Sequence, residues 1–379
     1  MGAAPTSRSP AMAASEGRRA VRSVAFYLPQ YHPTAENDAW WGAGFTDWIN
    51  VVRAAPRFRG HYQPHLPADL GFYDLRSPET REAQAELARS HGVDGFCYYH
   101  YWFNGRPLLE RPFNEVLASG KPDFPFLLCW ANENWTRVWD GGSRQVLIEQ
   151  RYSEVDDRAH IRSLLPAFGD RRYITVDGRP VFLVYRAGAL PDPSRTTEVW
   201  RQEAAAAGLR GLYLCRVDTD GDDRADPRRT GFDAAVEFQP DTSLATRRIG
   251  RNRVGGALTA RGHARNFVMD YADLVTQAMQ RPPAEYVRFP CVMTAWDNSA
   301  RRHEGAWIFH GSTPDSYGSW LRTALDRFEP PTPEENLVFT NAWNEWAEGN
   351  HLEPDQRWGR GYLEAHAAAL AGVTQAREP

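Results

Sequence analysis

The chain has 379 residues, is 42% hydrophobic and carries a formal net charge of -4 at pH 7. The apolar fraction is ordinary for a globular protein with a buried core, and the weakly acidic balance excludes nucleic acid as an expected partner. No stretch approaches the roughly 20 apolar residues that span a bilayer. Aromatic residues make up 12% of the chain; they stack on sugar rings but also fill cores, so composition favours a carbohydrate site only slightly.

The N-terminal residues 1–20 are rich in Ala, Ser, Pro and Arg without periodicity, so we expect a disordered tail there. Residues 21–372 are predicted to form one domain, followed by a C-terminal tail over 373–379. The N-terminus contains no apolar segment of signal-peptide length. The four cysteines lie in separate strand-like runs without zinc-motif spacing, which predicts buried free thiols. Together these features predict a cytoplasmic protein.

From residue 21 onward, short β-branched or aromatic runs alternate with helix-like segments. The predicted strands are 23–28, 95–101, 125–130, 181–185, 212–216, 234–238, 291–295 and 337–341. The predicted helices are 78–91, 112–119, 154–168, 197–207, 271–279, 314–328 and 361–370. The segment 172–179 contains Asp177-Gly178, a hairpin-turn signal, and is predicted to form a small ribbon before the fourth strand.

Eight strands alternating with helices, without an internal repeat or a mid-chain linker, predict a single α/β domain of the (β/α)8 TIM-barrel type with elaborated βα loops. A doubly wound open sheet is the alternative. That fold would need a Gly-rich phosphate loop after the first strand, where this chain has the sequence PQYHP (residues 29–33). The barrel is therefore the expected fold.

A barrel places its catalytic groups at the C-terminal ends of the strands and in the loops that follow. Polar and aromatic residues concentrate at these positions after several predicted strands. Because the strand ends meet on one face of the barrel, we expect an oligosaccharide or polysaccharide site there. The residues predicted to contact the substrate are Tyr27, Tyr31, His32, Tyr99, His100, Trp102, Trp130, Asn132, Glu133, Glu237, Trp296, Asp297, Asn344, Trp346 and His351.

Two glutamates, Glu345 and Glu348, follow the eighth predicted strand and are flanked by Trp343 and Trp346. They share one face if the strand breaks into a helical turn there. In an aromatic-walled pocket, one carboxyl group protonates a glycosidic oxygen while the other acts as base or nucleophile. Apolar walls and like-charge proximity raise one pKa and so divide the two roles. The alternative is a solvated pair on the first turn of a helix; the two tryptophans favour catalysis.

The other candidate groups also have ordinary interpretations. His32, His100 and His351 lack the spacing of a metal motif, so we expect hydrogen bonding in a pocket wall and no metal ligation. Asp297 and Glu133 can equally be structural, since an Asp at a strand end often caps the next helix. The Arg-rich segment 224–253 is predicted to be a solvated loop, with contact to an acidic or phosphorylated glycan as the alternative. Nothing in the sequence requires a cofactor or indicates an oligomeric state.

Several motifs are long enough to indicate a family. They are AFYLPQYHP from Ala25, WWGAGFTDW from Trp40, YQPHLP from Tyr62, GFCYYHYWF from Gly95, CWANENW from Cys129 and NAWNEWAEGNHLEPD from Asn341. With these motifs, the chain resembles over residues 23–367 the WbsX-like proteins, a group related to glycoside hydrolase family 99 and often found in polysaccharide gene clusters.

The resemblance implies roles for the two glutamates. Glu345 would deprotonate the substrate's own 2-hydroxyl, whose oxygen attacks C1 to form a 1,2-anhydro sugar, while Glu348 would act as acid and then as base. The anomeric configuration would be retained. Because the 2-oxygen must lie anti to the leaving group, the resemblance points to an α-linked sugar of manno or rhamno configuration.

Two other functions remain open at this stage. A glycosyltransferase of cell-surface polysaccharide biosynthesis would usually carry a nucleotide site or a D-x-D metal motif. Asp218-Thr219-Asp220 has that form, but it follows the fifth predicted strand of a barrel and is expected to be a loop. A non-catalytic glycan-binding barrel would need the aromatic residues but not the paired carboxylates. A retaining glycoside hydrolase is therefore the leading hypothesis.

Overall fold

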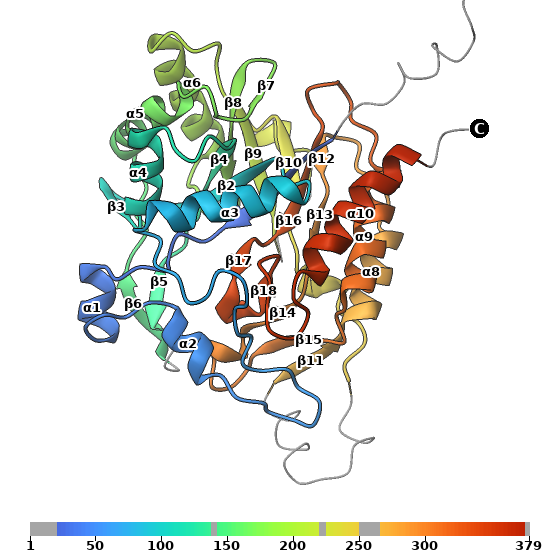
Figure 1. Ribbon diagram of the computed structural model, residues 1–379. Coiled ribbons are helices and arrows are strands. Elements are labelled where there is room, and N and C mark those ends of the chain that lie inside the picture. Colours follow the sequence, from blue (N-terminus) through green and yellow to red (C-terminus); the bar gives the residue numbers. More distant parts are fainter. Residues whose placement is uncertain (1–20, 138–141, 220–224, 250–265, 376–379) are drawn as a thin grey trace, which may run out of the picture.

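The computed structural model describes residues 21–137, 142–219, 225–249 and 266–375. A parallel sheet forms its centre and helices surround it (Figure 1), which confirms the predicted (β/α)8 barrel. The predicted tail 1–20 lies outside the described residues. The barrel strands are β1 (Arg22–Tyr27), β2 (Gly95–Phe103), β4 (Phe126–Trp130), β8 (Arg179–Val184), β9 (Tyr213–Asp218), β10 (Ala234–Glu237), a seventh strand made of β12 (Arg288–Phe289) and β13 (Cys291–Met293), and β16 (Leu337–Asn341).

The seventh strand closes the barrel, and Pro290 interrupts it. Its first half pairs with β10 through Ala235 and Arg288, and its second half pairs with β16 through Cys291 and Phe339. Proline has no N–H and cannot donate to a strand ladder, but the carbonyl of Pro290 still accepts a hydrogen bond of 2.8 Å from Phe339 N. All the barrel pairings are parallel, so the C-terminal ends of the strands share one face.

The strands are hydrophobic on both faces, as expected for a parallel sheet that has a packed interior and is covered by helices. Every residue of β4 is buried, as is every residue of β16. The predicted buried free thiols are confirmed, because all four cysteines are unpaired and buried within barrel strands: Cys97, Cys129, Cys215 and Cys291.

Seven helices pack around the barrel strands in the described part of the chain, and side chains cap the N-termini of most of them. They are α3 (Pro78–Ser90), α4 (Arg111–Ser119), α5 (Glu154–Phe168), α6 (Pro193–Ala206), α8 (Tyr271–Gln280), α9 (Pro314–Arg327) and α10 (Gly361–Gln375). Helix α6 begins earlier than predicted because Asp192 caps it and Pro193 opens its first turn. Helix α10 runs to Gln375, into the predicted tail, and residues 376–379 lie outside the described part. Among the described residues, no helix is long and apolar enough to cross a membrane.

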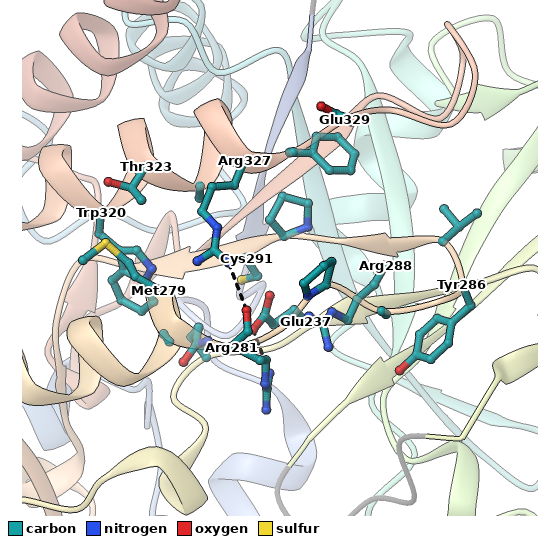
Figure 2. A pocket seen from close by; sticks show the side chains of 18 of the residues that line it. Glu237, Met279, Arg281, Tyr286, Arg288, Cys291, Trp320, Thr323, Arg327 and Glu329 are labelled. Atoms are coloured by element: carbon teal, nitrogen blue, oxygen red, sulfur yellow. Dashed lines mark hydrogen bonds and ion pairs between the residues drawn. The ribbon is translucent and has the colours of Figure 1, made fainter.

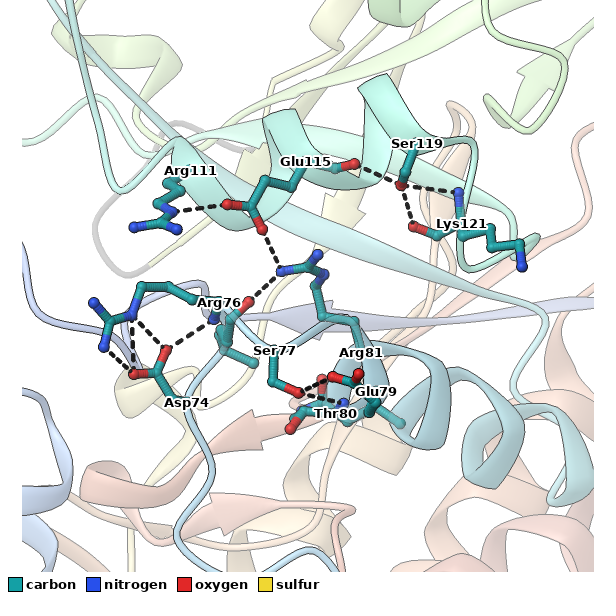
Figure 3. Close-up of polar contacts among 12 residues, drawn as sticks. Asp74, Arg76, Ser77, Glu79, Thr80, Arg81, Arg111, Glu115, Ser119 and Lys121 are labelled. Carbon is teal, nitrogen blue, oxygen red and sulfur yellow. Dashed lines mark hydrogen bonds and ion pairs between the residues drawn. The ribbon is translucent and has the colours of Figure 1, made fainter.

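Helices α3 and α4 are joined by a buried arginine (Figure 3). Arg81 of α3 donates a hydrogen bond of 2.5 Å to Leu75 O and pairs with Glu115 of α4 at 2.8 Å. Glu115 also accepts from Arg111 at 2.7 Å. Because the Arg81 side chain is only 4% exposed, this pair fixes how the two helices pack beside strand two.

Additional elements extend the loops at the C-terminal ends of the strands, and the sequence did not predict them individually. Strand one is followed by α1 (Ala35–Trp41) and α2 (Trp48–Arg53), and β2 folds back against β3 (Arg106–Leu108). The third barrel strand, β4, is followed by the hairpin of β5 (Trp135–Arg137) and β6 (Gly142–Ile148). A separate three-stranded sheet contains β11 (Phe267–Asp270), β14 (Trp296–Asp297) and β15 (Trp307–His310).

The predicted ribbon before the fourth strand is confirmed. Strand β7 (Thr175–Val176) pairs with the start of β8 in antiparallel register. Asp177 and Gly178 form the turn with φ angles of 52° and 71°. Positive φ at both central residues is typical of the type I′ turn that joins two antiparallel strands in a two-residue hairpin.

Candidate active site

The strand-eight loop, residues 342–355, carries both predicted catalytic glutamates. After β16, the chain forms a short hairpin of β17 (Asn344–Glu345) and β18 (Asn350–His351), connected by a 3-10 turn over Trp346–Glu348. The turn ends at Gly349, whose φ of 58° is a left-handed conformation that glycine adopts readily. The strand therefore breaks into a helical turn between the two glutamates, which is the condition under which the sequence placed them on one face.

Both glutamates contact the guanidinium of Arg301, which lies in the loop after the seventh strand. Its Nη1 is 2.9 Å from Glu348 Oε1, and its Nη2 is 3.2 Å from Glu345 Oε2. The same Nη2 pairs with Asp47, which precedes α2 and has a fully buried side chain. One cation thus holds three carboxylates together at the mouth of the barrel.

Burial raises the pKa of both glutamates. At Glu345 burial is the largest cause and Arg301 opposes it, while Glu348 and Asp47 add repulsion, so that the pKa rises to about 8. Burial likewise raises the pKa of Glu348 against the opposing charge of Arg301. One guanidinium does not neutralise three carboxylates, so the glutamate pair retains a proton at neutral pH. A carboxylic acid beside a carboxylate is the ionisation state that acid–base catalysis requires.

Residues at the end of strand one hold the strand-eight loop in place. The Tyr31 hydroxyl donates to Asn344 O at 2.8 Å and accepts from Trp346 N at 3.0 Å. The Asn344 amide accepts from Leu28 N at 2.7 Å and donates to Leu28 O at 3.1 Å. Tyr31 and Asn344, both predicted to contact substrate, are fully buried and instead position the backbone on either side of Glu345.

A buried carboxylate anchors the loop from behind. Glu353 accepts hydrogen bonds from Trp346 Nε1 at 2.7 Å, from the Tyr73 hydroxyl at 2.7 Å and from Gln84 Nε2 at 2.6 Å. Burial raises the pKa of Glu353 to about 7, against the lowering effect of these donors. The Trp346 ring stacks on His351 with centroids 3.8 Å apart. Trp346 and His351, both predicted to contact substrate, are therefore buried against each other and do not line the cleft.

The glutamates face a cleft of about 490 Å³ at the C-terminal face of the barrel. A cleft of this size suits a ligand of several sugar units. Its aromatic lining consists of Trp41, Tyr99, Tyr101, Trp135, Tyr185, Phe238, Trp296 and Trp307, and its charged lining of Glu133, Arg186, Arg301, Arg302, Glu345 and Glu348. Of the residues predicted for the site, this cleft brings together Tyr99, Glu133, Trp296, Glu345 and Glu348.

Three predicted residues of strands two and three lie outside the cleft, against helix α5. His100 and His160 share a hydrogen bond of 2.9 Å between their Nε2 atoms, Trp102 Nε1 donates to Asp156 at 3.0 Å, and Trp130 packs edge-on against His160. Successive side chains of a strand point to opposite faces. For this reason strand two presents alternate residues to the cleft and the intervening ones to the helix.

Asn132 and Glu133 both contact Arg186, which follows the fourth strand. The Asn132 amide donates to Arg186 O at 2.9 Å and accepts from Arg186 N at 2.7 Å, so it fixes the backbone there. Glu133 pairs with the Arg186 side chain at 2.8 Å and is half exposed. Asn132 thus acts on the cleft through Arg186, which lines it.

Glu237 lies in a separate cavity of about 440 Å³ between α8, α9 and the seventh strand. Its carboxylate pairs with Arg281 at 2.7 Å, and Met279, Trp320 and Arg327 line the same cavity (Figure 2). This cavity does not include the glutamates of the strand-eight loop.

The remaining predicted residues make contacts outside the cleft. The Tyr27 hydroxyl donates a hydrogen bond to Gln84 at 2.7 Å. His32 is buried, and its burial lowers the pKa of its imidazole to about 4. Asp297 shares hydrogen bonds with His61 at 2.5 Å and Gln63 at 2.7 Å, and its other oxygen caps the following 3-10 turn. Asp297 therefore caps the turn that follows its strand, which is the structural role that its position at a strand end allowed.

Asp218, the first residue of the D-x-D sequence, was expected in a loop but is the last residue of β9, and it does not line the cleft. Asp218 is buried and pairs with Arg216 at 2.8 Å, and Asp220 lies outside the described residues. The Arg-rich segment is described over 225–249 and includes strand β10 and short 3-10 turns, so this part is not a continuous loop. Its residues 224 and 250–253 lie outside the described part.

Sequence reasoning missed the two residues that organise the glutamates. Asp47 belongs to the WWGAGFTDW motif, so a signal for it was present. Arg301 follows a strand end without a local pattern, and only its position in space distinguishes it from its neighbour Arg302. Both arginines line the cleft.

Comparison with known proteins identifies the family. Residues 23–366 match the family described as Glycosyltransferase WbsX. The chain belongs to the WbsX family. This WbsX chain is 45% identical over 348 residues to two proteins of Xanthomonas campestris pv. campestris, from strains ATCC 33913 and B100, each named "Uncharacterized protein WxcX". The match covers 92% of the WbsX chain and 49% of each relative, so the chain spans about half their length.

Solved structures share the barrel of the WbsX chain. A glycoside hydrolase-like protein has a TM-score of 0.57 at 14% identity, over 94% of this chain and 95% of the other. The GH99 endo-alpha-mannosidase of Bacteroides thetaiotaomicron, in complex with bis-tris propane, has a TM-score of 0.54 at 15% identity, over 94% and 98% of the chains. These likenesses, together with the family match, confirm the resemblance that the motifs indicated.

Proposed function

We propose that this WbsX chain is a retaining glycoside hydrolase that cleaves an α-linked glycan of manno or rhamno configuration. The observation that supports the proposal is the convergence of Glu345 and Glu348 on Arg301 in the wall of an aromatic cleft. Two buried carboxyl groups that share a proton supply the acid and the base that a glycosidic bond requires. The flat faces of Tyr99 and Trp296 suit the stacking of sugar rings.

In the proposed reaction, the proton that burial keeps on Glu345 in the free protein passes to Glu348 when the glycan binds. Ionised Glu345 then takes the proton of the substrate 2-hydroxyl, and the 2-oxygen attacks C1. The bond from C1 to the leaving oxygen breaks as Glu348 protonates that oxygen, which gives a 1,2-anhydro sugar. Glu348 then takes a proton from water, the water oxygen attacks C1, and the 2-oxygen recovers its proton from Glu345. Two inversions at C1 retain the configuration. Attack by the 2-oxygen requires it to lie anti to the leaving group, hence the manno or rhamno configuration.

Arg301 has a positioning role in this scheme. It fixes the orientation of both carboxylates through separate nitrogens, and its charge favours their ionised forms against burial. Asp47 pairs with the same guanidinium and so helps to hold Arg301 in place against the two glutamates.

The test compares the wild type, Glu348→Gln and a control, Glu86→Gln, whose side chain is 73% exposed on α3. Each is assayed on α-mannosides and α-rhamnosides, both as aryl glycosides and as natural oligosaccharides, and NMR follows the anomeric configuration. We expect release with retention by the wild type and the control, and a loss of at least 100-fold in Glu348→Gln on natural oligosaccharides, on the order of general acid–base contributions. Inversion, or efficient cleavage of a β-glucoside, would exclude the mechanism.

A second candidate is a glycosyltransferase in cell-surface polysaccharide assembly, which the description of the matching family favours. Its signature is sugar transfer from a nucleotide-linked or lipid-linked donor without turnover of any glycoside. A third outcome, glycan binding by the wild type and Glu348→Gln alike with no product, would indicate a binding barrel.

A further inference from the structure

A second cavity, of about 220 Å³, adjoins the strand-eight loop. Trp296 lines both this cavity and the cleft. Histidines and aspartates gather on its wall: His61, His65, His310, His351, Asp297 and Asp355. His61 and Asp297 already hydrogen-bond to each other at 2.5 Å. His65, His351 and Asp355 form a distinct group among the described residues.

The three side chains present their donor atoms to one another. His65 Nδ1 lies 3.0 Å from His351 Nε2, which lies 3.9 Å from Asp355 Oδ2, and all three atoms fall within 4.8 Å of one another. Two imidazole nitrogens on a tetrahedral Zn²⁺ are about 3.3 Å apart, given Zn–N distances of roughly 2.0–2.1 Å. The distance between the two imidazole nitrogens is already close to this value, whereas Asp355 Oδ2 must move closer to both nitrogens to bind the same ion.

In His351 and Asp355, the atoms that point away from the group already have hydrogen-bond partners. His351 Nδ1 donates to Glu353 O at 2.9 Å, which leaves its Nε2 with a lone pair. Asp355 Oδ1 accepts from the backbone N–H groups of Arg357 and Trp358, at 3.0 and 2.5 Å. Metal-binding histidines generally donate their other N–H to a carbonyl or carboxylate in this way. The ring and the carboxylate are thus oriented by the protein itself.

We propose that His65 Nδ1, His351 Nε2 and Asp355 Oδ2 bind a divalent transition-metal ion of the Zn²⁺ class. Two imidazoles and one carboxylate are typical ligands of such ions, whereas Mg²⁺ and Ca²⁺ prefer sites made only of oxygen. All three residues are buried. The cavity beside them leaves room for a water molecule as a fourth ligand.

Without metal, the same geometry accommodates a hydrogen bond in which His65 Nδ1–H donates to His351 Nε2. Metal binding shifts the His65 proton to Nε2, so neither ring changes its charge. Arg357 also lines the cavity, with its guanidinium stacked over the Tyr62 ring at 4.7 Å. Its positive charge opposes a cation, so the imidazole bonds must supply the affinity, which again favours Zn²⁺ over Mg²⁺ or Ca²⁺.

A bound ion would connect the strand-eight loop to the segment that follows α2. His65 comes from the segment after α2, whereas His351 belongs to β18, 286 residues later. The Cβ that any other residue would have in place of Gly349 would lie 3.3 Å from His65 Cε1, so His65 packs directly against the residue after Glu348. We infer a positioning role for the ion, independent of the glycan that occupies the cleft.

The test uses untagged, chelator-treated protein that is equilibrated with Zn²⁺ and freed of excess by gel filtration. We expect one zinc per chain by mass spectrometry, a higher thermal midpoint with Zn²⁺, and visible absorption bands of four-coordinate Co²⁺ on substitution. Asp355→Asn keeps the backbone-capping oxygen and His65→Gln keeps a polar side chain. Each should bind zinc at least about 100-fold more weakly, since loss of even an outer partner costs 10–100-fold. His303→Gln, an exposed histidine outside the group, should bind like the wild type.

The wild type alone already decides the question, whatever the folding of the variants. Less than about a tenth of a zinc per chain with an unchanged thermal midpoint would overturn the proposal. Equal zinc affinity in Asp355→Asn, His65→Gln and the wild type would overturn the assignment of these ligands. Neither result depends on glycosidase activity, so the proposed function and the metal site fail separately.

Discussion

Replacing Glu345 by glutamine tests whether burial holds a proton on the glutamate pair. The Glu345 side chain is 8% exposed, and its pKa rises from an ordinary value of 4.5 to about 8, chiefly through burial. Between these two pH values the unfolded chain loses the proton of this residue while the folded protein keeps it. Protonated Glu345 contributes to the free energy of unfolding relative to its ionised form. This contribution is fully present below about pH 4.5 and is lost as the pH rises toward 8.

The size of the effect follows from the two pKa values. One pKa unit corresponds to about 1.4 kcal/mol, so ionised Glu345 destabilises the fold by roughly 5 kcal/mol at pH 8 and above. Glutamine has nearly the same shape and never ionises. Because Arg301 and Glu348 readjust when the charge is removed, we expect Glu345→Gln to be more stable than the wild type by roughly 2–5 kcal/mol at pH 8.5. Near pH 4.5 the two proteins should be equally stable.

The assay is urea unfolding of the wild type and Glu345→Gln from pH 4.5 to 9, with thermal midpoints as a second measure. Glu86→Gln, exposed on α3, is the matched control and should differ from the wild type by no more than about 0.5 kcal/mol at every pH. Parallel stability curves for Glu345→Gln and the wild type would refute the reasoning. In that case the glutamate would carry its charge in the folded protein at no cost.

Three further substitutions have defined outcomes. Tyr31→Phe removes the hydroxyl that bonds the backbone of Asn344 and Trp346, so urea unfolding should show a loss of about 1–3 kcal/mol; a stability equal to the wild type would contradict this anchor. Gly349→Ala places a methyl group 3.2–3.4 Å from neighbouring side chains at a φ of 58°, and a loss of about 1–3 kcal/mol is expected; an unchanged thermal midpoint would show that the turn adapts. Ser77→Ala removes the N-cap of α3 and should cost about 1 kcal/mol without affecting any activity of the distant cleft; a change in turnover would speak against a purely local role.

Strand positions and helix starts were predictable because their causes are local. Every predicted strand corresponds to a barrel strand, since a run buried on both faces must be hydrophobic throughout. Helix α5 spans the predicted 154–168 because Ser153 caps it. Helix α6 shows the limit of the method. The cap at Asp192 and the proline that follows were visible, but the helical pattern began later and outweighed them.

Alternation within a strand was also predictable in principle. Strand two contains a row of aromatic residues, and the motif by itself does not say which of them face inward. Once the barrel is closed, Tyr99 and Tyr101 line the cleft, whereas His100 and Trp102 lie on the opposite side, toward α5. The period of two separates the sets, but the choice of the inward set depends on how the sheet curves.

By itself, the sequence determined the barrel and the position of the paired glutamates after its last strand, because hydrophobic period, capping and turn chemistry act over a few residues. Only the tertiary structure decided what surrounds the pair. Arg301 reaches Asp47 across 254 positions of the chain, and His65 reaches His351 across 286. No local pattern encodes such meetings. They arise because closing the sheet brings the loops of distant strands to one face, where burial favours contacts between polar and charged groups.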